Sequence, residues 1–81
     1  MQLFYTERFR RSLADAPIEV QTQARKTLAL LLRDLRHPSL RAKKYDEARG
    51  IWQCRVNRSW RFYFVIEGDR YFLLDIMPHP K

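Results

Sequence analysis

The sequence predicts a small α+β protein of the order β-α-α-β-β-β, in which two helices pack on one face of a small antiparallel sheet. Two patterns predict this class. Apolar residues in the first half recur at the three- and four-residue steps of helices, and those in the second half alternate with the period of strands. The length of 81 residues leaves room for one core, so residues 1–81 are expected to form a single domain.

The first half opens with a short predicted strand, Gln2–Tyr5, and a helix over roughly residues 7–14. Thr6 is a suitable N-cap for that helix, because its side-chain oxygen can accept a hydrogen bond from the first turn. Residues 15–17 (Asp-Ala-Pro) interrupt the helical pattern, since proline is tolerated in a first helical turn but not inside a helix.

A second helix is predicted from about Pro17 to Arg36. Its apolar face consists of Val20, Ala24, Leu28, Leu31, Leu32 and Leu35. The helix should end before His37-Pro38, because the residue that precedes a proline is driven out of the helical region. The polar, basic and aperiodic stretch Ser39–Gly50 is interpreted as an exposed loop.

Three strands are predicted after Gly50. The first places Trp52, Cys54 and Val56 on one face, and the second places Trp60, Phe62, Phe64 and Ile66 there. The turn between them is Asn57-Arg58-Ser59, and Gly68-Asp69 forms a hairpin turn before the last strand. In that last strand, Arg70–Met77, strict alternation groups Phe72, Leu74 and Ile76 on one face, and Tyr71, Leu73 and Asp75 on the other.

The composition narrows the functional classes. The single cysteine, Cys54, excludes an internal disulfide, and no spacing of Cys and His suggests zinc, so neither metal nor cofactor is expected. No apolar run approaches the ~20 residues of a membrane helix. The N-terminus lacks the pattern of a signal peptide, which favours a cytoplasmic protein.

The basic charge points to an anionic partner. Sixteen Lys and Arg against nine Asp and Glu give a net charge of +7, and residues 36–61 hold eight of the basic residues but only two acidic ones. Such a concentration attracts nucleic acid or an acidic protein. If the tryptophans of the first two strands after Gly50 pack under the helices, the opposite face displays Gln53, Arg55, Arg61 and Tyr63. The two arginines would then lie within reach of one phosphate.

The segments Gly50–Val56 and Trp60–Phe64, with the histidine near the C-terminus, resemble the RelE/ParE superfamily of bacterial toxins, the toxin halves of type II toxin–antitoxin pairs. The resemblance implies a ribosome-dependent mRNA endoribonuclease that is held in check by an acidic antitoxin in a hetero-oligomer. The YoeB-like branch carries an arginine where Arg61 stands and a histidine at the spacing of His79. The family's general base is a glutamate or lysine of the loop before the second strand, and here Glu47 and Lys44 are both candidates.

Metal-free cleavage of RNA needs a base for the ribose 2′-hydroxyl, a cation for the phosphorane and an acid for the leaving 5′-oxygen. The resemblance assigns these roles to Glu47 or Lys44, to Arg61 and to His79. The residues expected to bind RNA are Arg41, Lys43, Arg49, Gln53, Arg55, Tyr63 and Lys81. Two other functions stay open: a ParE-like inhibitor of DNA gyrase without nuclease activity, and an inactive RNA-binding relative, which Pro80 favours because the YoeB-like tail has a tyrosine there.

Overall fold

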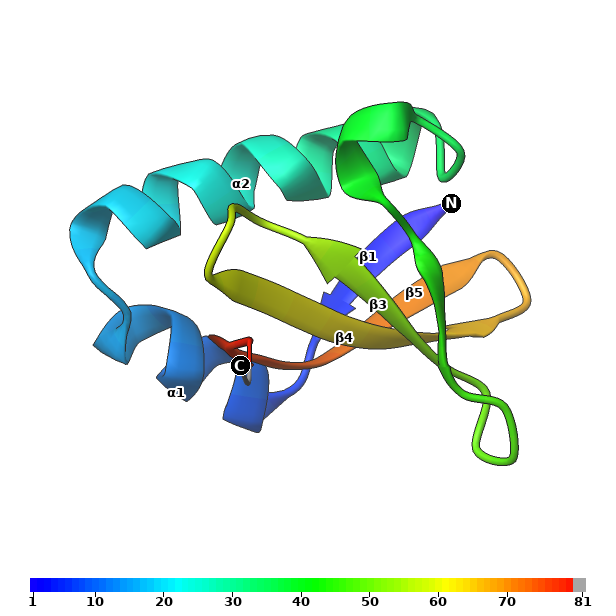
Figure 1. Cartoon of the computed structure of the whole chain (residues 1–81). Helices are drawn as coiled ribbons and strands as arrows, with labels where there is room; N and C mark the ends of the chain where they lie inside the picture. The colour runs from blue at the N-terminus through cyan, green and yellow to red at the C-terminus, as the bar shows by residue number, and fades with distance from the viewer. Residues whose placement is uncertain (80–81) are drawn as a thin grey trace.

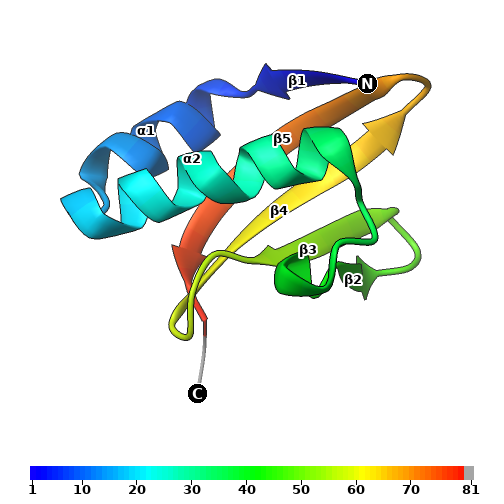
Figure 2. The ribbon, with the colours of Figure 1, turned by 90° about the horizontal axis from the view of Figure 1, so that it is seen from above.

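The computed structural model describes residues 1–79, which form a layer of two helices over one five-stranded sheet (Figure 1). The elements in chain order are β1 (Gln2–Tyr5), α1 (Glu7–Asp15), α2 (Ile18–Arg33), the 3₁₀ turn η1 (Pro38–Leu40), β2 (Lys43–Asp46), β3 (Ile51–Arg55), β4 (Trp60–Glu67) and β5 (Arg70–Pro78). Viewed from above, α1 and α2 lie side by side on the same face of the sheet (Figure 2). The predicted α+β class and the two-helix layer are confirmed.

The sheet has the strand order β1-β5-β4-β3-β2 and is mixed. Strands β3, β4 and β5 pair antiparallel, as predicted, and β2, which was not predicted, pairs antiparallel with β3. Strand β1, in contrast, pairs parallel with β5. The expectation of a purely antiparallel sheet is therefore wrong at this edge. The reason is that β1 and β5 are not joined by a hairpin: the whole chain between them, both helices included, separates them, and only a short turn imposes antiparallel pairing.

The helices begin where the sequence predicts, but the second ends early. The Thr6 side chain accepts a hydrogen bond from the Phe9 amide at 3.1 Å, which confirms the N-cap. Helix α2 stops at Arg33, three residues before the predicted end. Asp34 is extended there, and its carboxylate accepts a hydrogen bond from the Arg36 amide at 2.9 Å. This local turn competes with a further helical turn, so the helix ends before Pro38 is reached.

The segment predicted as a loop, residues 39–50, contains most of η1 and the edge strand β2. Arg41 adopts a left-handed conformation with a φ of 46° and turns the chain from η1 into β2. Strand β2 then pairs with β3, with a bulge between Lys44 and Asp46. Strand β2 is short and charged, so it shows no alternation of apolar and polar residues by which it could be predicted. Charged side chains are usual on an edge strand, because they discourage pairing with a further strand.

The core lies between the helices and the sheet. It joins Phe9 of α1 and the apolar stripe of α2 to side chains of β3, β4 and β5, including Cys54, Phe62 and Phe64. The predicted alternation of β5 is wrong in its first half: Tyr71 and Leu73 point into the core, and Leu74 does not. Leu74 is an extra residue in a β-bulge, since Phe64 pairs with Leu73 while the adjacent Tyr63 pairs with Asp75.

Candidate functional site

The face of the sheet that points away from the helices, called the outer face below, carries the two strand arginines of the predicted site, Arg55 and Arg61. Its residues on β3 and β4 form three cross-strand pairs: Ile51 with Val65, Gln53 with Tyr63, and Arg55 with Arg61. Directly opposite residues of an antiparallel pair lie on the same face, with Cβ atoms about 5 Å apart. The two arginines therefore lie side by side at the end of the strands, as the sequence predicts.

Two residues that were expected to be displayed on this face are covered. Gln53 is 5% exposed and Tyr63 is 7% exposed. Strand β2 runs beside β3 where a loop was expected, and it places Lys43 opposite Gln53. The ring of Tyr45 packs edge-on against Tyr63, with 4.8 Å between the ring centroids. Lys43 and Tyr45 of β2 therefore expose their side chains on the outer face in place of Gln53 and Tyr63.

The turn between β3 and β4 holds the two arginines together. Arg61 donates from Nη1 to the carbonyl oxygens of Asn57 at 2.7 Å and of Trp60 at 3.0 Å. Arg55 donates from Nε to the same Asn57 carbonyl at 3.3 Å. The Asn57 side chain stabilises the turn, because its Oδ1 accepts hydrogen bonds from the amides of Ser59 and Trp60. Both guanidinium groups are thus directed to one point by a single backbone carbonyl.

Electrostatics make this point attractive to an anion. Partial burial, together with the positive charges of Arg55 and Arg41, lowers the pKa of Arg61. Arg41, Arg55 and Arg61 are called the arginine cluster below. Within residues 1–79, no carboxylate lies within ion-pairing distance of these three side chains. A phosphate bound here would relieve the repulsion and accept hydrogen bonds from guanidinium groups in their preferred geometry.

His79 lies at the same end of the sheet. Its backbone amide donates to the carbonyl oxygen of Ser59 at 2.6 Å, and Met77, two residues earlier, pairs with Arg61. The chain thus carries an exposed histidine to the turn that holds Arg55 and Arg61. The neighbouring residues Pro80 and Lys81, the second of which was expected to bind RNA, lie outside the described part of the chain.

The two candidate bases are not beside Arg61. Lys44 pairs with Trp52, whose side chain packs against the core, and its Nζ lies 5.3 Å from the Trp52 ring centroid. Lys44 is therefore on the opposite face of the sheet. Its Nζ also lies 3.9 Å from a carboxylate oxygen of Glu47. Glu47 lies in the turn before Ile51, at the end of β3 that is far from Arg55. The four residues from Ile51 to Arg55 alone span about 13 Å along the strand.

The other two basic candidates of this hairpin, Lys43 and Arg49, differ in whether their charge is free to meet RNA. Lys43 shares the outer face with the arginine cluster. Arg49, in contrast, donates from Nε to Asp46 at 2.7 Å, and this hydrogen bond lowers the pKa of the Asp46 carboxyl. The charge of Arg49 is thus already paired within the β2–β3 hairpin.

Sequence reasoning missed a hollow of about 460 Å³ on the outer face, next to the arginine cluster. Tyr45, Tyr63 and Met77 line it, Asp75 contributes a carboxylate, and Arg8 and Arg49 contribute guanidinium groups. One feature of the sequence indicates a functional residue here, because Asp75 is the only charged residue in the apolar run 71–77. Its position could not be derived, because the bulge at Leu74 sets which way it points.

Two further features were sought in the part of the chain that the structure describes, a metal centre and a membrane span. Among residues 1–79, no group of three or more His, Cys, Asp or Glu side chains is placed to hold a metal ion. In the same range, neither helix has the length and apolar composition needed to cross a bilayer.

Comparison with solved structures identifies the fold. A YoeB/ParE toxin from Agrobacterium tumefaciens superposes over 99% of this chain and 100% of its own, with a TM-score of 0.78 and 14% sequence identity. The toxin–antitoxin complex RelBE2 from Mycobacterium tuberculosis matches over 96% of both chains, with a TM-score of 0.77 and 17% identity. The RelBE toxin–antitoxin complex from E. coli matches over 98% of this chain and 96% of its counterpart, with a TM-score of 0.73 and 15% identity. No family model and no curated protein matches the sequence.

The chain therefore has the RelE/ParE toxin fold over nearly its whole length. The resemblance that the sequence suggested is confirmed at the level of the fold. At identities below a fifth, the function has to be argued from the site.

Proposed function

We propose that this protein is the toxin of a type II toxin–antitoxin pair and that it cleaves ribosome-bound mRNA. The observation that carries the proposal is the arginine cluster: Arg55 and Arg61 pair across β3 and β4 on the outer face, and the charge of Arg41 also acts on Arg61. Among residues 1–79, none of the three has a carboxylate partner. Like charges repel in a folded protein, and a site that tolerates this repulsion is typical of anion binding. RNA is the polyanion that the RelE-like fold makes the first choice.

In the proposed reaction, Arg61 and Arg55 hold the non-bridging oxygens of the scissile phosphate. The 2′-oxygen of the preceding ribose gives its proton to a general base and attacks phosphorus, and the bond from phosphorus to the 5′-oxygen breaks. The guanidinium groups stabilise the charge that develops on the phosphorane. His79, whose backbone is anchored at Ser59, is the proposed proton donor to the leaving 5′-oxygen. No metal ion takes part in this scheme.

Neither of the two candidates for the general base lies beside Arg61. Glu47 and Lys44 were the candidates from sequence, but the first lies at the far end of β3 and the second on the other face of the sheet. A group from this hairpin can serve as the base only if the hairpin rearranges on the ribosome. This geometry favours a second candidate function, an RNA-binding relative that blocks translation without cutting.

The proposed partners are the ribosome with its message and a cognate acidic antitoxin, and the proposed location is the cytoplasm. Two of the structural neighbours, from M. tuberculosis and E. coli, are toxin–antitoxin complexes. The net charge of +7 supports a partner of opposite charge. A disordered acidic segment that folds along the outer face would neutralise the arginine cluster and exclude RNA.

Induced expression of the parent protein tests the proposal directly. The 5′ ends of cellular mRNA are mapped after induction, and DNA gyrase supercoiling is assayed in parallel. The proposal expects new 5′ ends within translated messages and unchanged supercoiling. Inhibited supercoiling without cleavage would replace the proposal by a gyrase inhibitor, and arrested translation without cleavage would favour the RNA-binding relative.

A further inference from the structure

The hollow beside the arginine cluster is a second feature of the outer face, and the phosphate chemistry above does not use it. It holds about 460 Å³, which is of the size of a small-ligand pocket. Its walls are largely aromatic and apolar, with Tyr45, Tyr63 and Met77, and its charged groups are the carboxylate of Asp75 and the guanidinium groups of Arg8 and Arg49. Both arginines lie within ion-pairing distance of a carboxylate, Arg8 of Asp75 and Arg49 of Asp46. A largely apolar pocket with a carboxylate in its wall suits a flat, apolar ligand that also donates hydrogen bonds.

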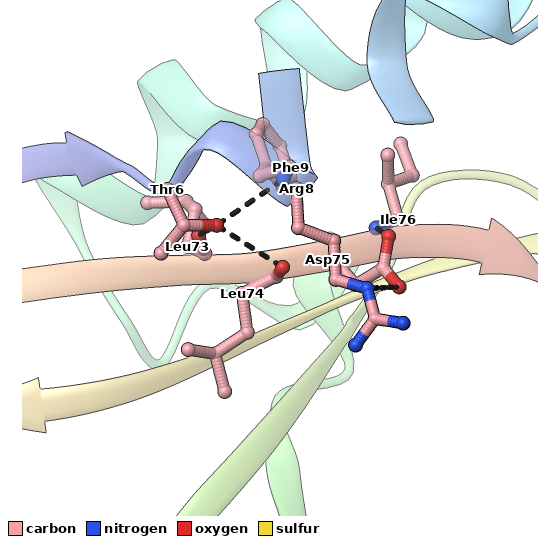
Figure 3. A network of polar contacts seen from close by, with 7 residues as sticks. All are labelled: Thr6, Arg8, Phe9, Leu73, Leu74, Asp75 and Ile76. Carbon is pink, nitrogen blue, oxygen red and sulfur yellow. Dashed lines mark hydrogen bonds and ion pairs between the residues drawn. The ribbon is translucent and has the colours of Figure 1, made fainter. Parts of the chain in front are cut away.

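The β-bulge of β5 creates this arrangement (Figure 3). Leu74 is the extra residue, and the Thr6 hydroxyl bridges the carbonyls on both sides of the irregularity, at 2.8 Å to Leu73 and 3.2 Å to Leu74. Beyond the bulge, Asp75 faces the outer side opposite Tyr63. Bulges often re-aim a side chain next to a functional site. Here the bulge places a carboxylate on the same face of the sheet as Lys43, Arg55 and Arg61.

Asp75 retains capacity to accept hydrogen bonds. Its side chain is 18% exposed; Oδ1 accepts one hydrogen bond, from the Ile76 amide at 2.8 Å. Oδ2 faces Nε of Arg8 at 3.6 Å, which is longer than the usual charge-assisted hydrogen bond (Figure 3). The Arg8 side chain is 80% exposed, so it is free to move aside. An ionised carboxylate has about four acceptor positions, and most of them stay available to a ligand.

We propose that this hollow binds one base of the message and that Asp75 selects guanine; the inference rests on the proposed RNA-binding function. Arg61 and Tyr63 are two residues apart on β4, or about 7 Å. A nucleotide can span that step, with its phosphate on the arginine cluster and its base in the hollow, against the exposed ring of Tyr45 and beside Tyr63. Single-stranded bases are recognised in this way, by stacking on aromatic side chains and by hydrogen bonds to the Watson–Crick edge.

The preference for guanine follows from hydrogen-bond donors. A carboxylate only accepts, and guanine presents two adjacent donors, N1–H and the 2-amino group, to its two oxygens. Adenine and cytosine offer an amino group next to a ring acceptor, and uracil offers one N–H between two carbonyl oxygens. In each of these three, an acceptor would face the carboxylate. Asp75 therefore favours guanine and disfavours the other bases.

The charges of the hollow argue against a protein segment as its occupant. The two arginines of the lining are already opposite carboxylates, Arg8 opposite Asp75 and Arg49 opposite Asp46. The proposed antitoxin is acidic, and its carboxylates would be repelled by Asp75 with no unpaired arginine of the lining to offset the repulsion. An apolar side chain would remove water from the carboxylate without supplying a donor, which costs free energy. A guanine base supplies both an apolar ring and the donors.

The test measures binding without cleavage. Trinucleotides with a central G, A, C or U between two uridines, all 2′-O-methylated so that they cannot be cut, are titrated against the protein at low salt by NMR. The parent should bind the G trinucleotide about tenfold more tightly than the others, with shifts at Tyr63 and Asp75. Asp75→Asn should reduce G binding roughly five- to hundredfold, the value of a bidentate base contact, and change the others less than twofold.

Two control variants sharpen the measurement. Asp69→Asn removes the same charge from an exposed hairpin turn and should keep the preference for G. Tyr45→Ala removes an exposed wall of the hollow and should weaken all four ligands together. Asn at position 75 keeps an oxygen that can accept from the Ile76 amide, so the variant should fold.

The outcomes separate the hollow from the nuclease. Equal affinities for the four trinucleotides, no binding at millimolar concentration, or a preference that survives Asp75→Asn would overturn the assignment. Loss of antitoxin affinity in Asp75→Asn without any base preference would assign the hollow to the protein partner and would also overturn it. A parent that selects G but cuts no message would keep the hollow and disprove only the proposed cleavage.

Discussion

At the scale of single residues, Arg61 combines a structural role with the proposed chemical one. Its guanidinium donates to the carbonyls of Asn57 and Trp60 and is partly buried beside Arg55. The same contacts that position it for a phosphate also tie the β3–β4 turn to β4. Removing the side chain should therefore change the free energy of unfolding and the rate of cleavage by different amounts. Comparing the two effects separates the structural role of Arg61 from its proposed chemical role.

We predict that Arg61→Ala lowers ribosome-dependent cleavage by on the order of 10²–10³, because a preorganised donor to the phosphorane is lost. The free energy of unfolding should fall by about 1 kcal/mol, the usual value of a lost hydrogen bond. Single-turnover cleavage and urea unfolding measure the two effects. Arg58→Ala removes an exposed arginine of the same turn and should leave cleavage nearly unchanged. Equal cleavage by the two variants would give Arg61 a structural role only.

Cys54 illustrates a buried group that takes no part in the site. Its side chain is fully buried in the core, and burial raises the pKa of the thiol to about 12 from an ordinary value of 9.0. A thiol held neutral in this way is a poor nucleophile, which fits its place under α2 rather than on the outer face. Its titration also makes the fold sensitive to alkali.

The sign of that effect follows from proton binding. Above about pH 9 the unfolded chain releases the thiol proton while the folded chain keeps it, so the free energy of unfolding falls with rising pH, by about 1.4 kcal/mol per pH unit until about pH 12. Below pH 9 the contribution is constant. Burial also raises the pKa of Tyr63 and of Tyr71, which act in the same direction at higher pH. Urea unfolding of the parent and of Cys54→Ala between pH 8 and 10 should show the steeper loss in the parent. Parallel curves would contradict the assignment to Cys54.

At the scale of elements, the sequence predicted what local interactions determine. The start of α1 at Thr6 and the body of α2 follow from one cap and one apolar stripe, which neighbouring residues alone decide. The Arg55–Arg61 pair was predictable for the same reason, since the short turn at Asn57 sets the register of β3 and β4. Strand β2 was missed, because its edge position depends on pairing with β3 rather than on its own pattern.

The hollow and the parallel β1 depend on contacts between distant parts of the chain. The bulge at Leu74 is stabilised by Thr6, 68 residues away in the sequence, and no period in residues 70–77 reveals it. The bulge in turn decides which face carries Asp75. Site residues on regular strands could thus be predicted from sequence, and the one beyond the irregularity could not.

The bulge leads to a testable prediction about β5. Deletion of Leu74 should leave a folded protein, because Leu73 and Asp75 would become adjacent and all the remaining residues of β5 would stay on their present faces. The carbonyl contact from Thr6 to Leu74 and the shape of the hollow would be lost. Circular dichroism and urea unfolding should show a cooperative transition. Deletion of Val65 from β4, which has no extra residue opposite to absorb it, should prevent a cooperative transition by moving core residues to the wrong face.

At the scale of the whole molecule, the net charge of +7 is divided between surfaces. The outer face carries the arginine cluster and Lys43, while the other side of the sheet edge carries Lys44, which is paired with Glu47 and lies over Trp52. Net charge alone makes all basic residues equivalent for long-range attraction. Direct contact with RNA should instead involve only the cations of the outer face.

Adjacent lysines on opposite faces of β2 make this distinction measurable. Each lysine that contacts a phosphate releases counterions, so binding to ribosomes should weaken with salt by about one unit of log affinity per log salt for each contact. Lys43→Ala should reduce this slope by roughly one, because Lys43 shares the outer face with Arg55 and Arg61. Lys44→Ala removes an identical charge one residue away and should leave the slope unchanged. Ribosome affinity measured at several KCl concentrations for the parent and both variants provides the comparison. A slope that falls for Lys44→Ala and not for Lys43→Ala would place the RNA on the helical side of the sheet and would remove the arginine cluster from the interface.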